Sequence, residues 1–190
     1  MLFDNHTYHL ISLLKGVNSI SGLSHKRILN LTDGDRLTST QRGKIAELHV
    51  ATALMAQTGG RLSPFEPLSD DHGVDLVVLD KVSGASLPIQ VKSWFLSPDK
   101  PTNRVQFDVQ KTTYSTEQRG AVVCVVLEPT TLAISVGWVI PLDRVASVGT
   151  DQPKKYALAP SRLATSNDKY TEFRCHTLGE LAAAVTAQLH

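Results

Sequence analysis

Cysteine and long apolar runs are both scarce in this sequence of 190 residues. Its two cysteines, Cys124 and Cys175, form no Cys-x-x-Cys pattern, which argues against a disulfide framework and favours a reducing compartment. The apolar run at 121–127 is far too short to cross a bilayer, and the first residues lack the basic start of a signal peptide. We therefore expect a soluble, cytoplasmic protein that makes no contact with a membrane.

An excess of charge of either sign is also missing. The chain carries 19 Lys and Arg against 18 Asp and Glu, a net charge of +1. This balance excludes a broad basic surface, so tight and metal-independent binding to DNA of any sequence is not expected. Apolar residues make up 42% of the chain, which excludes general disorder. The length fits one domain with small appendages.

The pattern of apolar residues predicts a mixed α/β domain around one sheet. The predicted elements are, in chain order, short helices at 6–16 and 24–31, a helix that begins with the capping box Thr38–Gln41 and ends at Gly59-Gly60, an extended stretch at 61–67, strands at 74–80 and 87–95, a weak helix at 107–118, strands at 121–128 and 132–140, and helices near 142–147 and at 177–188.

We divide the chain into an N-terminal helical extension (1–37), a core (38–150) and a C-terminal extension that packs on the core (151–190). The N-terminal helices either pack on the core or mediate formation of a homodimer, and the sequence leaves both alternatives open.

The hairpin of the strands 74–80 and 87–95 carries polar residues in apolar surroundings. A turn centred between Val82 and Ser83 sets Asp75 directly opposite Gln90, with Cβ atoms roughly 4.5–5.5 Å apart. Lys92 lies two residues further on and therefore shares the face of Gln90. This register gathers a carboxylate, an amide oxygen and an ammonium. A structural Asp75–Lys92 salt bridge explains the same residues equally well.

Glu47 favours a functional site over a structural one. On a helical wheel it lies among Val50, Leu54, Ala51 and Met55, so it projects from the apolar arc that should face the sheet. The alternative, a surface glutamate paired with a neighbouring lysine, is less favoured by this position.

Taken in order, Glu47, the segment His72-Gly-Val-Asp75 and the segment Ile89-Gln-Val-Lys92 resemble the PD-(D/E)XK nuclease superfamily, which has a restriction-endonuclease-like fold. Members with Gln-x-Lys in place of (D/E)-x-Lys, among them some restriction and homing endonucleases, are the most similar. The resemblance covers about 43–128 and implies an αβββαβ core. Val74 stands in the position of the name-giving proline, and Gln90 replaces the second acidic ligand.

The resemblance implies metal-assisted hydrolysis of a phosphodiester bond in nucleic acid, expected to be DNA. Asp75, the Gln90 side-chain oxygen and the Val91 carbonyl would hold Mg²⁺, for which Mn²⁺ can substitute. Lys92 would orient the attacking water and stabilise charge on the phosphate. Glu47 would orient Lys92 or a metal-bound water, or help to bind a second ion.

Weaker candidate site residues follow Lys92 in the sequence. Gln110 and Tyr114 form a Gln-x-x-x-Tyr pattern similar to that of RecB-like nucleases, and on a helix they would share a face. Lys111 is a candidate phosphate contact. Two further interpretations of the whole chain remain. One is a catalytically inactive domain of the same fold that binds nucleic acid or a protein, and the other is an interaction protein that dimerises through its N-terminal helices.

Overall fold

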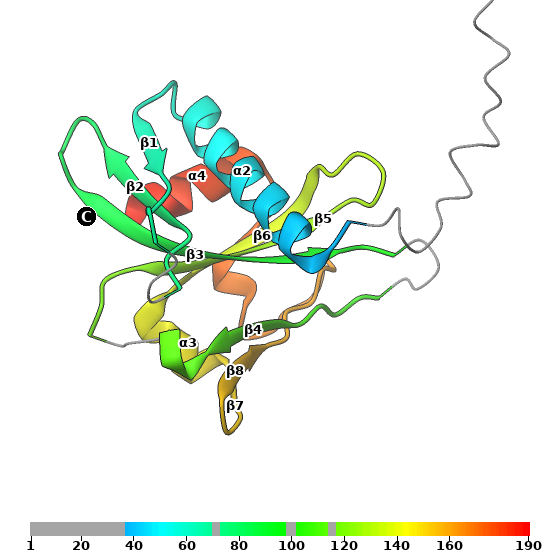
Figure 1. Ribbon diagram of the computed structural model, residues 1–190. Coiled ribbons are helices and arrows are strands. Elements are labelled where there is room, and N and C mark those ends of the chain that lie inside the picture. The colour runs from blue at the N-terminus through cyan, green and yellow to red at the C-terminus, as the bar shows by residue number, and fades with distance from the viewer. Residues whose placement is uncertain (1–36, 70–72, 98–101, 114–116) are drawn as a thin grey trace, which may run out of the picture. The chain divides into compact units, whose positions relative to one another are not determined.

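The computed structural model describes residues 37–69, 73–97, 102–113 and 117–190 (Figure 1). Its helices are α2 (Ser39–Gln57), α3 (Leu142–Val148) and α4 (Leu178–Ala187), and its 3₁₀ turns are η3 (Lys111–Thr113) and η4 (Thr171–Phe173). The strands are β1 (Leu62–Phe65), β2 (Leu76–Asp80), β3 (Ser86–Phe95), β4 (Phe107–Gln110), β5 (Ala121–Leu127), β6 (Ile134–Pro141), β7 (Thr150–Asp151), β8 (Lys155–Leu158) and β9 (Arg174–Cys175). The predicted helices at 6–16 and 24–31 lie outside the described residues.

A mixed sheet of six strands, in the order β1-β2-β3-β5-β6-β9, forms the centre of the fold. Strands β3 and β5 run parallel, whereas the other neighbouring pairs are antiparallel. All seven residues of β5 are buried, as expected for a central strand that is covered on both faces. The predicted α/β domain with a mixed central sheet and flanking helices is confirmed.

The two faces of the sheet pack against different layers, which Figure 1 shows on opposite sides of β3 and β5. Helices α2 and α4 contact each other and cover one face, where Val50 and Leu54 of α2 pack with Ile89 and Val91 of β3. The other face carries α3 and a second sheet with the order β4-β8-β7. Because side chains alternate along a strand, β3, β5 and β6 contribute to both cores, whereas β1 and β2 contribute to the core beneath α2 and α4.

The hairpin of β2 and β3 has the predicted register. Leu76 faces Ile89, and Leu79 faces Ser86, so the turn is centred where the sequence predicted it. Gly84 has a φ of +75° in this turn, a conformation that glycine adopts without strain.

The predicted helix at 107–118 is wrong where the structure describes it. Phe107 and Val109 are buried and the residues between and after them are more exposed, so the pattern has the period of a strand. Strand β4 pairs with β8, which lies in a stretch of the sequence that is too polar to predict as a strand. Tertiary pairing thus overrides the weak helical pattern. Of the described residues in 107–118, only the three of η3 are helical.

The C-terminal segment is interleaved with both sheets, because β8 pairs with β4, β9 pairs with β6 and α4 contacts α2. Residues 39–190 group as one unit. The division into extension, core and tail at 37/38 and 150/151 stays a prediction. Among the helices of the described ranges, none combines the length and the apolar character that a transmembrane helix needs.

A buried carboxylate ties β1 to the turn between β2 and β3. Asp80 is fully buried and accepts hydrogen bonds from Arg61 Nε (2.9 Å) and Nη2 (2.6 Å). It also accepts from the Val82 N–H (3.0 Å) and the Ser83 hydroxyl (2.8 Å). These partners, Arg61 first, hold the pKa of Asp80 well below its usual range despite the opposing effect of burial.

We predict that Asp80→Asn lowers the free energy of unfolding near pH 7 and that its difference from the wild type shrinks in acid. The folded-state pKa of Asp80 is depressed, so its contribution is fully present above the ordinary value of 3.8 and is lost as the pH falls further. Urea unfolding between pH 7 and pH 3 measures this. Asp143→Asn, at an exposed position, is the matched control, and an Asp80→Asn effect of constant size at every pH would contradict the prediction.

Candidate functional site

The candidate site begins where β2 separates from β3. The ladder of paired residues ends at Leu76 and Ile89, although the Asp75 N–H still donates to the Ile89 carbonyl at 2.9 Å. The next N–H of β3 on this side, that of Val91, donates to the Asp75 carboxylate Oδ2 at 2.6 Å. The Asp75 side chain therefore takes the place of a main-chain partner at the fork between the two strands.

Glu47 of α2 reaches the same place. It lines a pocket with Asp75, and we call this the acidic pocket; its lining residues are Lys44, Glu47, Glu66, Pro67, Ser69, Val74 and Asp75. The side chain of Glu47 is 20% exposed. The helix buries Ala46, Val50, Ala53 and Leu54 around this position.

Lys44 lies among the acidic groups of this pocket. Its Nζ is 3.1 Å from Glu47 Oε2 and 2.7 Å from Glu66 Oε2. The hydrogen bond to Glu66 is the main cause of a raised Lys44 pKa, which burial partly opposes. Glu47 thus combines the two arrangements considered from the sequence, because it lines a pocket and also pairs with a neighbouring lysine. Met55, which the helical wheel placed in the buried arc, is 43% exposed.

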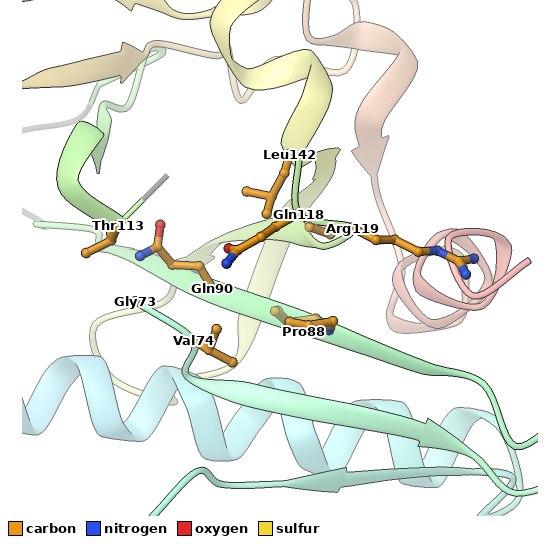
Figure 2. Close-up of a pocket in the computed structure, with 10 residues that line it drawn as sticks. Gly73, Val74, Pro88, Gln90, Thr113, Gln118, Arg119 and Leu142 are labelled. Carbon is orange, nitrogen blue, oxygen red and sulfur yellow. The ribbon is translucent and has the colours of Figure 1, made fainter. Parts of the chain in front are cut away.

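Gln90 points into a different pocket. Its neighbour in β5 is Val122, which belongs to the core on the face opposite α2. The residue is 8% exposed, and its Oε1 is buried without a hydrogen-bond partner. We call this cavity the Gln90 pocket; its lining residues are Gly73, Val74, Pro88, Ile89, Gln90, Thr113, Gln118, Arg119, Ala121 and Leu142 (Figure 2).

Lys92 lies on the same face as Gln90, next to Cys124 of β5. Its charge reaches Asp108 of β4. Burial raises the pKa of Asp108, but the hydrogen bond from Lys155 and the charges of Lys155 and Lys92 outweigh burial, so this pKa lies below its ordinary value. Burial raises the pKa of the Cys124 thiol above its usual range, and Lys92 opposes that effect. The thiol therefore stays protonated and unreactive.

The structure brings the candidates together in part. Asp75 and Glu47 share the acidic pocket, and Gln90 lines the neighbouring one. Val74 lines both, so it forms a wall between them. Lys92 lines neither. Within the described part of the chain, no three His, Cys, Asp or Glu side chains gather closely enough to hold a metal ion.

The candidates after Lys92 fall into a different local structure from the one predicted. Gln110 is the exposed last residue of β4, so the helix face that it would share with Tyr114 is not formed there; Tyr114 and His72 lie outside the described residues. Lys111 donates to Asp151 at 2.5 Å and lies over the ring of Tyr156, with Nζ 5.0 Å from its centroid.

Two charged residues of the acidic pocket, Lys44 and Glu66, were not named as candidates from the sequence. Lys44 precedes Glu47 by three residues, a spacing at which side chains meet on a helix, and it is the neighbouring lysine of the surface-pair alternative for Glu47. Glu66 comes from the segment after β1 and joins them only through the tertiary fold.

No family model and no curated protein matches this chain. Among solved structures, one that is similar is a bacterial homing endonuclease, at 20% sequence identity and a TM-score of 0.47. The match covers 80% of this chain and 99% of the other.

Gly73 supports the position of Gln90. It has a φ of +67°, and a Cβ there would lie 2.4 Å from Gln90 Nε2 and 2.7 Å from Thr113 Cβ. The chain at this glycine therefore packs directly against the glutamine amide.

We predict that Gly73→Ala destabilises the fold more than Gly84→Ala does. Both glycines have positive φ values, so each alanine is strained by about 1–2 kcal/mol. A Cβ at Gly84 meets nothing within 4 Å, whereas one at Gly73 displaces Gln90 and adds about 1–3 kcal/mol. Urea unfolding of the two variants isolates this contact, and equal losses would show that the amide is not held by Gly73.

Proposed function

We propose that this protein is a metal-dependent endonuclease of the PD-(D/E)XK type that hydrolyses phosphodiester bonds in DNA. The observation that carries the proposal is the position of Asp75. Its carboxylate lies at the fork of β2 and β3, lines a pocket with Glu47 and binds the N–H of Val91. The strand that it binds is the one that carries Gln90 and Lys92.

The donor atoms of the acidic pocket suit Mg²⁺ or Mn²⁺. Mg²⁺ takes oxygen ligands, commonly one or two carboxylates, and keeps several waters or substrate phosphate oxygens. Asp75 and Glu47 supply two carboxylates, and the Val91 carbonyl is the expected main-chain ligand. A site of this kind does not need three acidic side chains, which agrees with their absence as a cluster among the described residues.

A bound cation would polarise the scissile phosphate and lower the pKa of the attacking water. The residues of the chain would position these groups. Asp75 is held by the Val91 N–H, so its carboxylate has a defined place at the end of β2. Lys92, two residues beyond Gln90 on β3, would orient the water and stabilise negative charge on the phosphate. A ligand role for Gln90 stays a prediction, since this residue lines the neighbouring pocket.

One observation favours the alternative of an inactive domain of the same fold. The Lys44 ammonium contacts Glu47 and Glu66 in the acidic pocket and offsets part of its negative charge. A divalent cation would have to compete with Lys44 for Glu47. The inactive domain would bind nucleic acid or a protein partner without cleavage. Dimerisation and a cytoplasmic setting stay predictions.

We predict that Asp75→Asn and Lys92→Met each reduce Mg²⁺-dependent cleavage of DNA by about 10²-fold or more. The first removes a carboxylate that would hold the cation, and the second removes the ammonium that would stabilise charge on the phosphate. Rates are measured on duplex, single-stranded and branched DNA and on RNA, with Mg²⁺ or Mn²⁺.

The matched controls are Asp143→Asn and Lys154→Met, which change exposed residues outside both pockets. They should keep the wild-type rate, and circular dichroism should show that all four variants are folded. Cleavage that survives in Asp75→Asn rules out this site. Binding without cleavage in the wild type, with every metal and substrate, supports the inactive alternative.

We predict that Lys44→Met tightens Mn²⁺ binding several-fold, while Asp75→Asn and Glu47→Gln weaken it. Lys44 is paired with a carboxylate that the cation needs, so its removal frees Glu47. Isothermal titration calorimetry in the absence of DNA measures this, with Lys154→Met as the control for loss of one positive charge. Weaker binding in Lys44→Met would mean that Lys44 supports the cation site and does not compete with it.

A further inference from the structure

The Gln90 pocket holds an unpaired polar atom outside the acidic pocket in which the cation would bind. Gln90 Oε1 is buried in a residue that is 8% exposed, and it has no hydrogen-bond partner. A buried carbonyl oxygen without a donor destabilises a fold, so its presence beside a cavity indicates that a bound molecule supplies the missing donor.

The amide is oriented by its surroundings. Its Nε2 packs against Gly73, where an added Cβ would come within 2.4 Å. Thr113 flanks the same side. Figure 2 shows the carbonyl oxygen of Gln90 directed into the space between Thr113, Gln118 and Leu142. The atom of the amide that lacks a partner is therefore a hydrogen-bond acceptor, and it is buried in the wall of the cavity, so a ligand reaches it by a small rotation of the amide.

The unpaired Gln90 carbonyl oxygen determines which ligands can bind beside it. A phosphate or carboxylate would place negative oxygen against carbonyl oxygen, whereas a neutral N–H group would complete the hydrogen bond. Arg119, the cation among the lining residues, points away from the cavity (Figure 2) and donates to the Gln188 carbonyl at 2.8 Å. The pocket is therefore not built to attract an anion.

The walls and the size favour a flat ring. Val74, Pro88 and Leu142 are apolar surfaces around the glutamine, and the cavity encloses about 290 Å³. This volume lies just below the range of about 300–1,000 Å³ that is usual for ligand pockets, so it suits one small ring system. A nucleobase combines apolar faces with N–H donors on its edge.

We propose that the Gln90 pocket binds one unpaired nucleobase of the nucleic acid, with an N–H of the base donating to Gln90 Oε1. The inference rests on the proposed nuclease function for its ligand. Val74 lines both pockets, so the base would lie beside the phosphate that is to be cleaved. A base inside a duplex cannot reach such a pocket unless it leaves the stack. Substrates with an unpaired base, such as single strands, bulges or mismatches, are therefore preferred.

The experiment measures binding without cleavage. The full chain is titrated in Ca²⁺, which takes oxygen ligands as Mg²⁺ does, against three duplexes of otherwise equal sequence: one fully paired, one with a single unpaired adenine, and one with an abasic residue at the same place. The unpaired adenine should bind about tenfold or more tightly than the abasic duplex, because only the base fills the pocket.

Two variants connect this preference with the pocket. Gln118→Trp fills the mouth from an exposed position, and Gln90→Leu removes the acceptor. Both should lose the preference for adenine over the abasic residue, and Gln118→Trp should keep the affinity for the paired duplex. Gln57→Trp, the same change at an exposed position outside the pocket, should retain it. If Gln90→Leu does not fold, Gln118→Trp carries the test alone.

The outcomes separate this inference from the nuclease proposal. Equal binding of the adenine and abasic duplexes overturns the base pocket, even if Asp75-dependent cleavage is found. A preference that survives in Gln118→Trp also overturns it, as does a complete lack of DNA binding. A preference for adenine that depends on the pocket, in a protein that cleaves no substrate, supports the base pocket and contradicts the proposed nuclease activity.

Discussion

The hydrogen bond between the Val91 N–H and the Asp75 carboxylate is the contact on which the rest of the site depends. It forms where β2 stops pairing with β3, so a side chain satisfies a strand donor that would otherwise face an open fork. The bond fixes Asp75 between two layers. The helix α2 approaches from one side with Glu47, and Gln90 and Lys92 lie on the opposite face of β3. One fork therefore separates an acidic pocket from a neutral, largely apolar one.

The two pockets differ in whether their polar groups already have partners within the protein. In the acidic pocket, the ammonium of Lys44 already pairs with Glu47 and Glu66, so any divalent cation enters by competition and with help from the charge of its substrate. In the neighbouring pocket, Gln90 Oε1 has no partner at all. An overall charge of +1 agrees with recognition through such local contacts and a metal ion, and it does not provide a broad basic surface.

Local patterns predicted much of this arrangement. The alternation in the two hairpin strands, with a turn of suitable length, was sufficient to set the register from Leu76–Ile89 to Leu79–Ser86 correctly, because a shift by one residue would expose the apolar face. The wheel of α2 likewise placed Glu47 near the sheet. Partners distant in sequence were not predictable. The pattern of β4 predicts a helix because its strand partner β8 lies 45 or more residues later in a polar stretch. The separation of Gln90 from the acidic pocket depends on Val74 and on the opening of the fork, neither of which a strand pattern encodes.

The most direct test of the account is a crystal structure of the full chain grown with Mn²⁺, in which anomalous scattering locates the metal. We expect an anomalous peak within bonding distance of the Asp75 carboxylate, inside the pocket that Glu47 lines. Lys44 should then be turned away from Glu47. An ordered acidic pocket that holds no Mn²⁺ at a saturating concentration, with the contact of Lys44 and Glu47 intact, would contradict it.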